Sequence, residues 1–117
     1  MNQRARREAQ GRRGEALAAL YLRLKGWRIL AQRLKTPRGE IDLIARRGRT
    51  VIFVEVKWRS SAELLDAAID PYRLRRVAAA AEAVAHRHAR PDDLVRIDVL
   101  LLAPWRFPRH LENALAA

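Results

Sequence analysis

The stretch of sequence that decides the fold spans residues 39–58 and reads GEIDLIARRGRTVIFVEVKW. Its first part, residues 40–45, and its last part, residues 50–58, are rich in apolar and β-branched residues. The four residues between them are polar and include Gly48, which is typical of a turn. The stretch therefore predicts a β-hairpin.

Four charged side chains share one face of this hairpin. Side chains alternate along a strand, so Glu40 and Asp42 point to one side of the first strand, and Glu55 and Lys57 point to one side of the second. If the numbers of paired residues sum to 97, Asp42 lies opposite Glu55 and Glu40 lies opposite Lys57. Any odd sum keeps all four groups on the same face.

This set of groups is typical of a metal site that cleaves phosphodiester bonds. Two carboxylates that face each other repel unless a cation lies between them, and Mg²⁺ takes oxygen ligands of this kind. The ammonium group of Lys57 can orient the attacking water or stabilise charge on the phosphate. The simpler interpretation is a solvated polar face, in which Glu–Lys pairs add little stability.

Two features of the sequence favour the metal site. Residues 51–54 and Val56 are apolar, which is typical of a central strand that surrounds its charges with apolar groups. Lysine is also rare, because the 24 cationic residues include three lysines, Lys25, Lys35 and Lys57. Unlike arginine, lysine shifts its pKa readily, so its use at position 57 suits a catalytic role.

The charge of the chain points to a polyanionic partner. The chain has 117 residues and a net charge of +11. Residues 1–49 hold 14 basic and 4 acidic side chains, whereas residues 50–117 hold 10 basic and 9 acidic side chains. A basic field of this kind attracts nucleic acid. The absence of cysteine excludes disulfides, thiolate metal sites and cysteine nucleophiles.

The length of the chain is that of one domain, with residues 1–11 expected as a basic N-terminal arm and residues 12–117 as the domain. A helix is predicted over residues 12–25, ended by Gly26 and expected to be buried on two faces. Its two apolar stripes are Leu17, Leu20, Tyr21 and Leu24, and Ala18, Ala19 and Leu22. Glu15 falls in the second stripe and is expected to have a partner or a task, because an unpaired buried charge is costly.

A strand over residues 27–34, a helix over residues 71–88 and a strand over residues 94–102 complete the pattern. Asp70 is expected to cap the second helix, with Pro71 in its first turn. The predicted order is α-β-β-β-α-β, an α/β (α+β) fold with a mixed sheet flanked by helices. We find no apolar segment of roughly 20 residues and no signal peptide, so no membrane association and a cytoplasmic location are expected.

Other candidate groups carry less information. His86 and His88 are two positions apart on a helix, so they point in different directions and are expected to complement the helix C-terminus rather than share a metal. Arg73 and Arg76 lie about one turn apart, a spacing that suits contact with adjacent phosphates or simple solvation of the helix. The three tryptophans are expected in the core or at an interface, with stacking on unpaired bases as the alternative.

The residues of the hairpin and the first helix together resemble a known family. Asp42 and the triplet at residues 55–57 resemble the active-site pattern of the PD-(D/E)xK nuclease superfamily. More specific are Gly14-Glu15 with Ala18 and Leu22, residues 39–44, and residues 53–57 followed by Arg59. Over roughly residues 11–103 the chain resembles the YraN-type uncharacterised protein family, whose members are taken to be distant relatives of archaeal Holliday junction resolvases.

This resemblance implies a restriction-endonuclease-like core with Glu15, Asp42 and Glu55 as metal-site carboxylates, Lys57 as the catalytic lysine and Glu40 as an accessory group. It also implies Mg²⁺ or Mn²⁺ as the cofactor and DNA as the substrate. Resolvase-like proteins commonly dimerise to cut two strands, so a homodimer is an expectation. The basic residues expected to bind nucleic acid are Arg12, Arg13, Arg38, Arg59, Arg73 and Arg76.

The sequence therefore predicts a divalent-metal-dependent endonuclease, a hydrolase that cleaves the phosphodiester bonds of DNA, including branched or junction DNA. The alternative is a non-catalytic nucleic-acid-binding module on the same fold, since relatives tend to carry a Lys-Gln pair where this chain has Arg73-Leu74. A third interpretation is an interaction protein that uses the hairpin and the tryptophans in an assembly.

Overall fold

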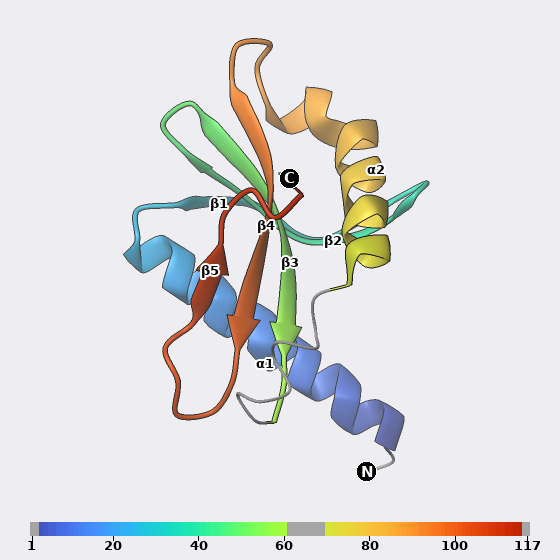
Figure 1. Ribbon diagram of the computed structural model, residues 1–117, viewed down its shortest axis with the longest axis vertical. Helices are drawn as coiled ribbons and strands as arrows, with labels where there is room; N and C mark the ends of the chain where they lie inside the picture. The colour runs from blue at the N-terminus through green and yellow to red at the C-terminus, as the bar shows by residue number, and fades with distance from the viewer. Residues whose placement is uncertain (1–2, 61–69, 116–117) are drawn as a thin grey trace.

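The computed structural model describes residues 3–60 and 70–115 and places a five-stranded sheet between two helices (Figure 1). In chain order the elements are α1 (Gln3–Leu24), β1 (Arg28–Thr36), β2 (Gly39–Arg47), β3 (Thr50–Trp58), α2 (Pro71–His88), β4 (Leu94–Leu102) and β5 (Arg109–Leu111). The predicted order is confirmed, and the short strand β5 follows it. The loop expected after β3 lies mostly at residues 61–69, outside the described residues.

The strands follow one another across the sheet in chain order. β1, β2 and β3 form an antiparallel meander, β4 pairs with β3 in parallel after the crossover through α2, and β5 pairs with β4 in the antiparallel sense. The predicted mixed sheet is therefore confirmed. The ladder between β2 and β3 runs from Arg47↔Thr50 to Leu43↔Val54, in the register whose partner numbers sum to 97.

Alternation along the strands divides the core into two layers, one on each face of the sheet. In β3, Ile52 and Val54 pack with α1, whereas Val51 and Phe53 pack with α2. The helices contribute Ala18, Ala19 and Leu22 to the first layer and Ala80, Ala81 and Val84 to the second. Because both faces of β3 are covered, its central part is a continuous apolar run.

Helix α1 differs from the predicted helix in its start and in its buried face. It begins at Gln3 rather than at residue 12, because the arginine, glutamine and alanine residues of this segment favour a helix. The stripe of Leu17, Leu20 and Leu24 was expected to be buried, but these side chains are 47%, 50% and 79% exposed. The face that packs on the sheet is the stripe with the small alanines, because small side chains let the helix approach the strands closely.

The predicted helix boundaries at Gly26 and Asp70 are confirmed. Gly26 has a φ of +90°, and the N–H of Trp27 donates a hydrogen bond to the carbonyl oxygen of Leu22 at 2.9 Å. This geometry terminates α1. The Oδ1 atom of Asp70 accepts a hydrogen bond from the N–H of Tyr72 at 2.9 Å and caps α2. Within the part of the chain that the structure describes, neither helix combines the length and apolarity needed to cross a membrane.

A buried charge network, which sequence reasoning missed, holds the C-terminal segment against β4. Asp98 is fully buried. Its carboxylate accepts hydrogen bonds from Arg96 Nη2 at 3.0 Å and from the N–H of Asn113 at 2.9 Å, and lies 2.7 Å from His110 Nε2. Burial by itself would raise the pKa of Asp98, but the hydrogen bonds from His110, Asn113 and Arg96 together lower it below 3.8. The network therefore anchors β5 to the sheet.

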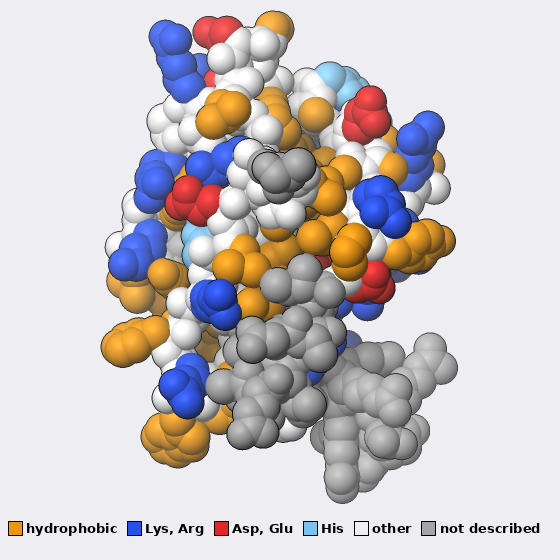
Figure 2. All heavy atoms as spheres, viewed as in Figure 1, with side chains coloured by type: hydrophobic (Ala, Val, Ile, Leu, Met, Phe, Trp, Pro, Cys, Tyr) orange, Lys and Arg blue, Asp and Glu red, His pale blue; other side chains and the backbone are white. Residues whose placement is uncertain are grey.

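The connection between β4 and β5 exposes two aromatic side chains. Trp105 is 101% exposed and Phe107 is 97% exposed, so Trp105 does not lie in the core, whereas Trp27 is buried. Figure 2 shows hydrophobic side chains exposed over this connection, at the lower left of the view. The two aromatics and the exposed leucines of α1 line a groove of about 630 Å³, which we call the apolar groove.

We expect Asp98→Ala to lower the free energy of unfolding by about 3–5 kcal/mol, because it leaves the half-buried Arg96 without its closest charge partner and removes the buried acceptor of the network. Urea unfolding at pH 7 measures this loss. Asp92→Ala is the control. The Oδ2 atom of Asp92 lies 3.9 Å from Nη1 of Arg49, and both side chains are exposed, so this ion pair adds little and the expected change in the free energy of unfolding is within about 0.5 kcal/mol. Equal stability of the two variants would contradict the anchoring role of Asp98.

Candidate metal centre

The candidate centre begins where β2 leaves β3. The backbone ladder between these strands ends at Leu43↔Val54, one position before Asp42 and Glu55 would pair. Instead, the N–H of Val56 donates a hydrogen bond to Asp42 Oδ2 at 2.8 Å. The side chain thus satisfies a backbone donor that the ladder no longer serves. Beyond this point the β1–β2 hairpin and β3 take different directions (Figure 1).

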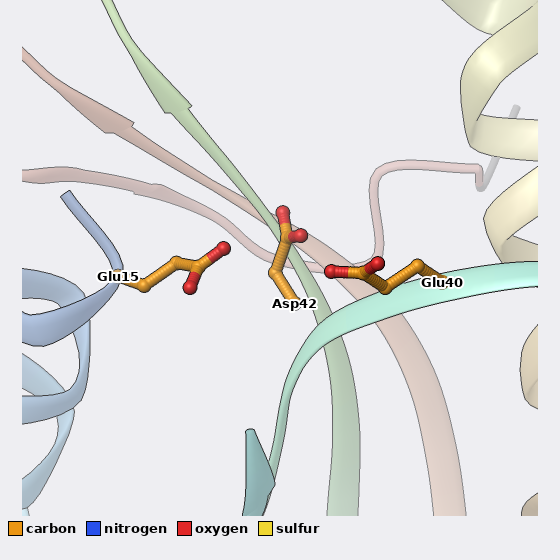
Figure 3. Close-up of side chains that lie close together, drawn as sticks. All are labelled: Glu15, Glu40 and Asp42. Carbon is orange, nitrogen blue, oxygen red and sulfur yellow. The ribbon is translucent and has the colours of Figure 1, made fainter. Parts of the chain in front are cut away.

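Three carboxylates meet at this divergence. Glu15 comes from α1, and Glu40 and Asp42 come from β2; Figure 3 shows Glu15 and Glu40 pointing toward Asp42 from opposite sides. One oxygen atom of each carboxylate lies within 4.8 Å of the other two. Among the residues that the structure describes, this is the one such group of three potential metal ligands. Carboxylate oxygens are the donors that Mg²⁺ prefers.

Asp42 is the carboxyl group most strongly affected by its surroundings. Burial raises its pKa most, the charge of Glu55 raises it further, and the hydrogen bond from Val56 lowers it. Glu15 and Glu40 also raise it, and the resulting pKa is about 7 rather than 3.8. A divalent cation at this position would favour the ionised form of Asp42.

Glu55 and Lys57 form a buried ion pair beside Asp42. They are 5% and 7% exposed, and Lys57 Nζ lies 3.0 Å from Glu55 Oε1. The same oxygen accepts a hydrogen bond from Arg73 Nη2 on α2 at 3.2 Å. The sequence predicts Glu55 as a metal ligand, whereas in the structure two cations hold its Oε1 atom. Glu40, expected as an accessory group, is the third member of the carboxylate cluster.

Arg33 on β1 is a site residue that sequence reasoning missed. Its guanidinium group forms an ion pair with Glu15, and this contact raises the pKa of Arg33. Arg33 has a φ of +53°, a backbone conformation that costs energy and is concentrated at functional sites. The turn between β1 and β2 pairs Thr36 with Gly39, and continuing this register along the strands places Arg33 opposite Asp42. The position of the turn in the sequence could therefore have indicated that Arg33 lies at the site.

Two cavities flank Asp42 and Glu55. One, of about 380 Å³, lies between β2 and α2 and is lined by Arg73 and Arg76; the other, of about 420 Å³, lies toward α1 and is lined by Arg59 and Arg73. Three of the six arginines predicted to bind nucleic acid therefore lie at the site. The other three are exposed and line neither cavity, namely Arg12, Arg13 and Arg38.

The raised pKa of Asp42 predicts how stability depends on pH in metal-free buffer. The folded state binds the proton of Asp42 more tightly than the unfolded state, so stability falls as the pH rises from about 4 to about 7. We expect Asp42→Asn to raise the free energy of unfolding at pH 8 by up to about 4 kcal/mol, and by less at pH 5. Urea unfolding in EDTA at both pH values measures this, with Asp92→Asn as the exposed control. A variant less stable than wild type at pH 8 would contradict the prediction.

Comparison with known proteins identifies the family. Residues 14–102 match the model of the uncharacterised protein family UPF0102. The chain is 69% identical over 108 residues to a UPF0102 protein of Sphingopyxis alaskensis, an alignment that covers 92% of this chain and 93% of that protein. It is 66% identical over 107 residues to a UPF0102 protein of Erythrobacter litoralis, with 92% of each chain covered. A UPF0102 protein of Caulobacter vibrioides is 51% identical over 105 residues, with 89% and 84% covered. The expected family is therefore confirmed, and the chain belongs to UPF0102, the family of the YraN-type proteins.

Proposed function

We propose that this chain is a divalent-metal-dependent endonuclease that hydrolyses the phosphodiester bonds of DNA, including branched or junction DNA. The observation that carries this proposal is the convergence of Glu15, Glu40 and Asp42 beside the buried Lys57. Carboxylates that can hold a cation, next to cationic groups that can bind phosphate, are the groups that metal-assisted phosphodiester hydrolysis requires.

The donor set fits Mg²⁺ or Mn²⁺. The three clustered donors are all carboxylates, which suit these hard cations. Glu55 stays in the proposed ligand set because it lines both cavities with Asp42, although its Oε1 atom also contacts Lys57 and Arg73. When bound, the cation would supply an activated water and neutralise charge on the phosphate.

The cationic side chains of the site have separate tasks. Glu55 holds Lys57 in place, so the ammonium group can orient the attacking water or stabilise charge on the phosphate as the bond breaks. From the first turns of α2, Arg73 lines both cavities and Arg76 lines the one beside β2; Arg59, directly after β3, lines the one toward α1. Their guanidinium groups can bind the phosphates on either side of the cleaved bond.

Cleavage assays on linear, flapped and four-way DNA with Mg²⁺ or Mn²⁺ test this proposal. We expect Asp42→Asn and Lys57→Ala each to lower the cleavage rate by about 10²–10⁴-fold, because each removes a group that acts at the reacting phosphate. Asp92→Asn and Lys35→Ala are matched controls that remove the same groups from exposed positions. Equal activity of all five proteins would refute the assigned site.

A second candidate is a non-catalytic nucleic-acid-binding module on the same fold. It is favoured by Glu55, whose Oε1 atom contacts Lys57 and Arg73. This candidate implies salt-dependent DNA binding without metal uptake. Titration calorimetry with Mn²⁺ separates the two: metal binding that is lost in Asp42→Asn and kept in Asp92→Asn supports the nuclease, whereas no metal binding by wild type supports the module.

We also propose that the chain forms a homodimer through the apolar groove. Two copies can meet there despite a net charge of +11, because Lys25 and Arg106 are the only charged residues among the described residues that line the groove. The exposed Trp105 and Phe107 each offer about 150–250 Å², together about half of the ~800 Å² that each partner buries in a stable complex. Because the aromatic side chains and the groove lie on the same face, the aromatics of each copy can contact the groove of the other, as in a two-fold symmetric dimer.

Leu20→Glu is expected to convert this dimer into a monomer, because it places a charge in the apolar groove at a side chain that is already 50% exposed. Sedimentation velocity measures the mass of each protein. Arg75→Glu adds a carboxylate at an exposed position of α2 and should leave the dimer intact. A monomeric wild type, or a Leu20→Glu variant that remains dimeric, would count against the proposed interface.

A further inference from the structure

A second group of cations lies at the opposite end of α2 from the carboxylates. It lines a cavity of about 460 Å³ between the last turn of α2 and the start of β1, which we call the distal basic cavity. Every charged residue in its lining is an arginine, and two histidines accompany them. These residues are Arg28, Arg46, Arg87, Arg90, His86 and His88.

Among the described residues, three of the four arginines in the distal basic cavity form no ion pair of their own, although the Asp93 carboxylate that pairs with Arg46 also attracts Arg90. Arg46 is neutralised, because its Nη2 atom lies 2.6 Å from Asp93 Oδ2. Arg28, Arg87 and Arg90 have exposed side chains, and no described carboxylate lies within ion-pair distance of them. The cavity therefore has an excess of positive charge.

The fold places these like charges close together. Arg28 is the direct partner of Arg46 in the ladder between β1 and β2, and Asp93 balances the charge of Arg46 but not that of Arg28 or of Arg87 in the same lining. Burial and the positive charges of Arg87 and His86 also lower the pKa of His88, which is consistent with a site that disfavours further positive charge. An anion is the ligand that would balance this positive charge.

The distal basic cavity is aligned with the carboxylate centre along one side of α2. Arg73 and Arg76 line the carboxylate centre, and Arg87 lines the distal cavity. At 3.6 residues per turn, these three arginines fall within about 60° of one another around the helix axis. Ala83 is half-buried on the same side between them, whereas Ala80 is buried against the sheet, so a small uncharged side chain separates the two sites. With a rise of about 1.5 Å per residue, Arg87 lies about 21 Å beyond Arg73.

We propose that the distal basic cavity binds a backbone phosphate of the same polynucleotide whose cleaved bond lies at the carboxylate centre. The identity of the ligand as nucleic acid rests on the proposed function. Duplex DNA advances about 3.4 Å per base pair, so a separation of about 21 Å corresponds to about six base pairs. The chain then favours DNA that extends at least about six base pairs to one side of the cut, without reading its sequence.

The test measures binding, in EDTA so that no cleavage occurs, to a fluorescein-labelled duplex of about 20 base pairs and to a hairpin with a stem of about three base pairs, which is about 10 Å long. The test variant combines Arg28→Ala, Arg87→Ala and Arg90→Ala. The control variant combines Arg23→Ala, Lys35→Ala and Arg75→Ala, which removes equal charge from exposed positions that line neither the apolar groove nor the cavities proposed to face DNA. Thermal unfolding confirms that both variants remain folded.

We expect the test variant to bind the duplex at least about tenfold more weakly than wild type and to show a salt slope smaller by about two to three. Its affinity for the hairpin should change much less, because the short stem cannot reach both sites. This inference is overturned if the test variant binds the duplex within about twofold of wild type, or if the control variant loses as much affinity as the test variant. In either case, cleavage of DNA by wild type would still support the proposed function. If wild type neither binds the duplex at about 50 mM salt nor cleaves DNA with Mg²⁺ or Mn²⁺, the proposed function itself fails.

Discussion

The hydrogen bond from the N–H of Val56 to Asp42 Oδ2 joins β2 and β3 at the point where their backbones separate. Up to Leu43↔Val54 the two strands satisfy each other's backbone groups. Beyond that pair, the N–H of Val56 needs another acceptor, because an unpaired buried donor is costly. Asp42 supplies it, so one carboxylate both completes the sheet and lies at the centre of the carboxylate cluster.

The packing of α1 on β3 brings the third carboxylate to this point. A Cβ atom on Gly14 would lie 3.4 Å from the Cβ atom of Trp58, which shows how closely the helix approaches the strand at this position. Glu15 follows directly and turns toward Asp42 (Figure 3). The contact therefore explains why a charged residue falls within the buried stripe of a helix, and Arg33 supplies the partner that such a charge requires.

Helix α2 carries positive charge toward the sheet at both of its ends. Its first turns bring Arg73 and Arg76 to the carboxylates, and its last turn brings Arg87 to the start of β1. Arg28 comes from the basic first half of the sequence and Arg87 from the nearly neutral second half. Although basic residues are unevenly distributed along the chain, the fold therefore brings arginines to both ends of α2, beside the carboxylate centre at one end and in the distal basic cavity at the other.

Local sequence was sufficient for most of the fold and for the main members of the site. The bounds of β3, α2 and β4 follow from alternation, helical period and the cap at Asp70, and the hairpin register follows from its turn. Those are short-range properties, which is why Asp42 and Lys57 could be predicted to share a face. The presence of Glu40 in the cluster with Glu15 and Asp42 depends on the divergence of β2 from β3, and the role of Arg33 depends on its approach to α1. Packing between elements far apart in the chain decided which stripe of α1 is buried and which cations surround the carboxylates. Periodicity along one element could not specify this, because it does not show what lies against that element.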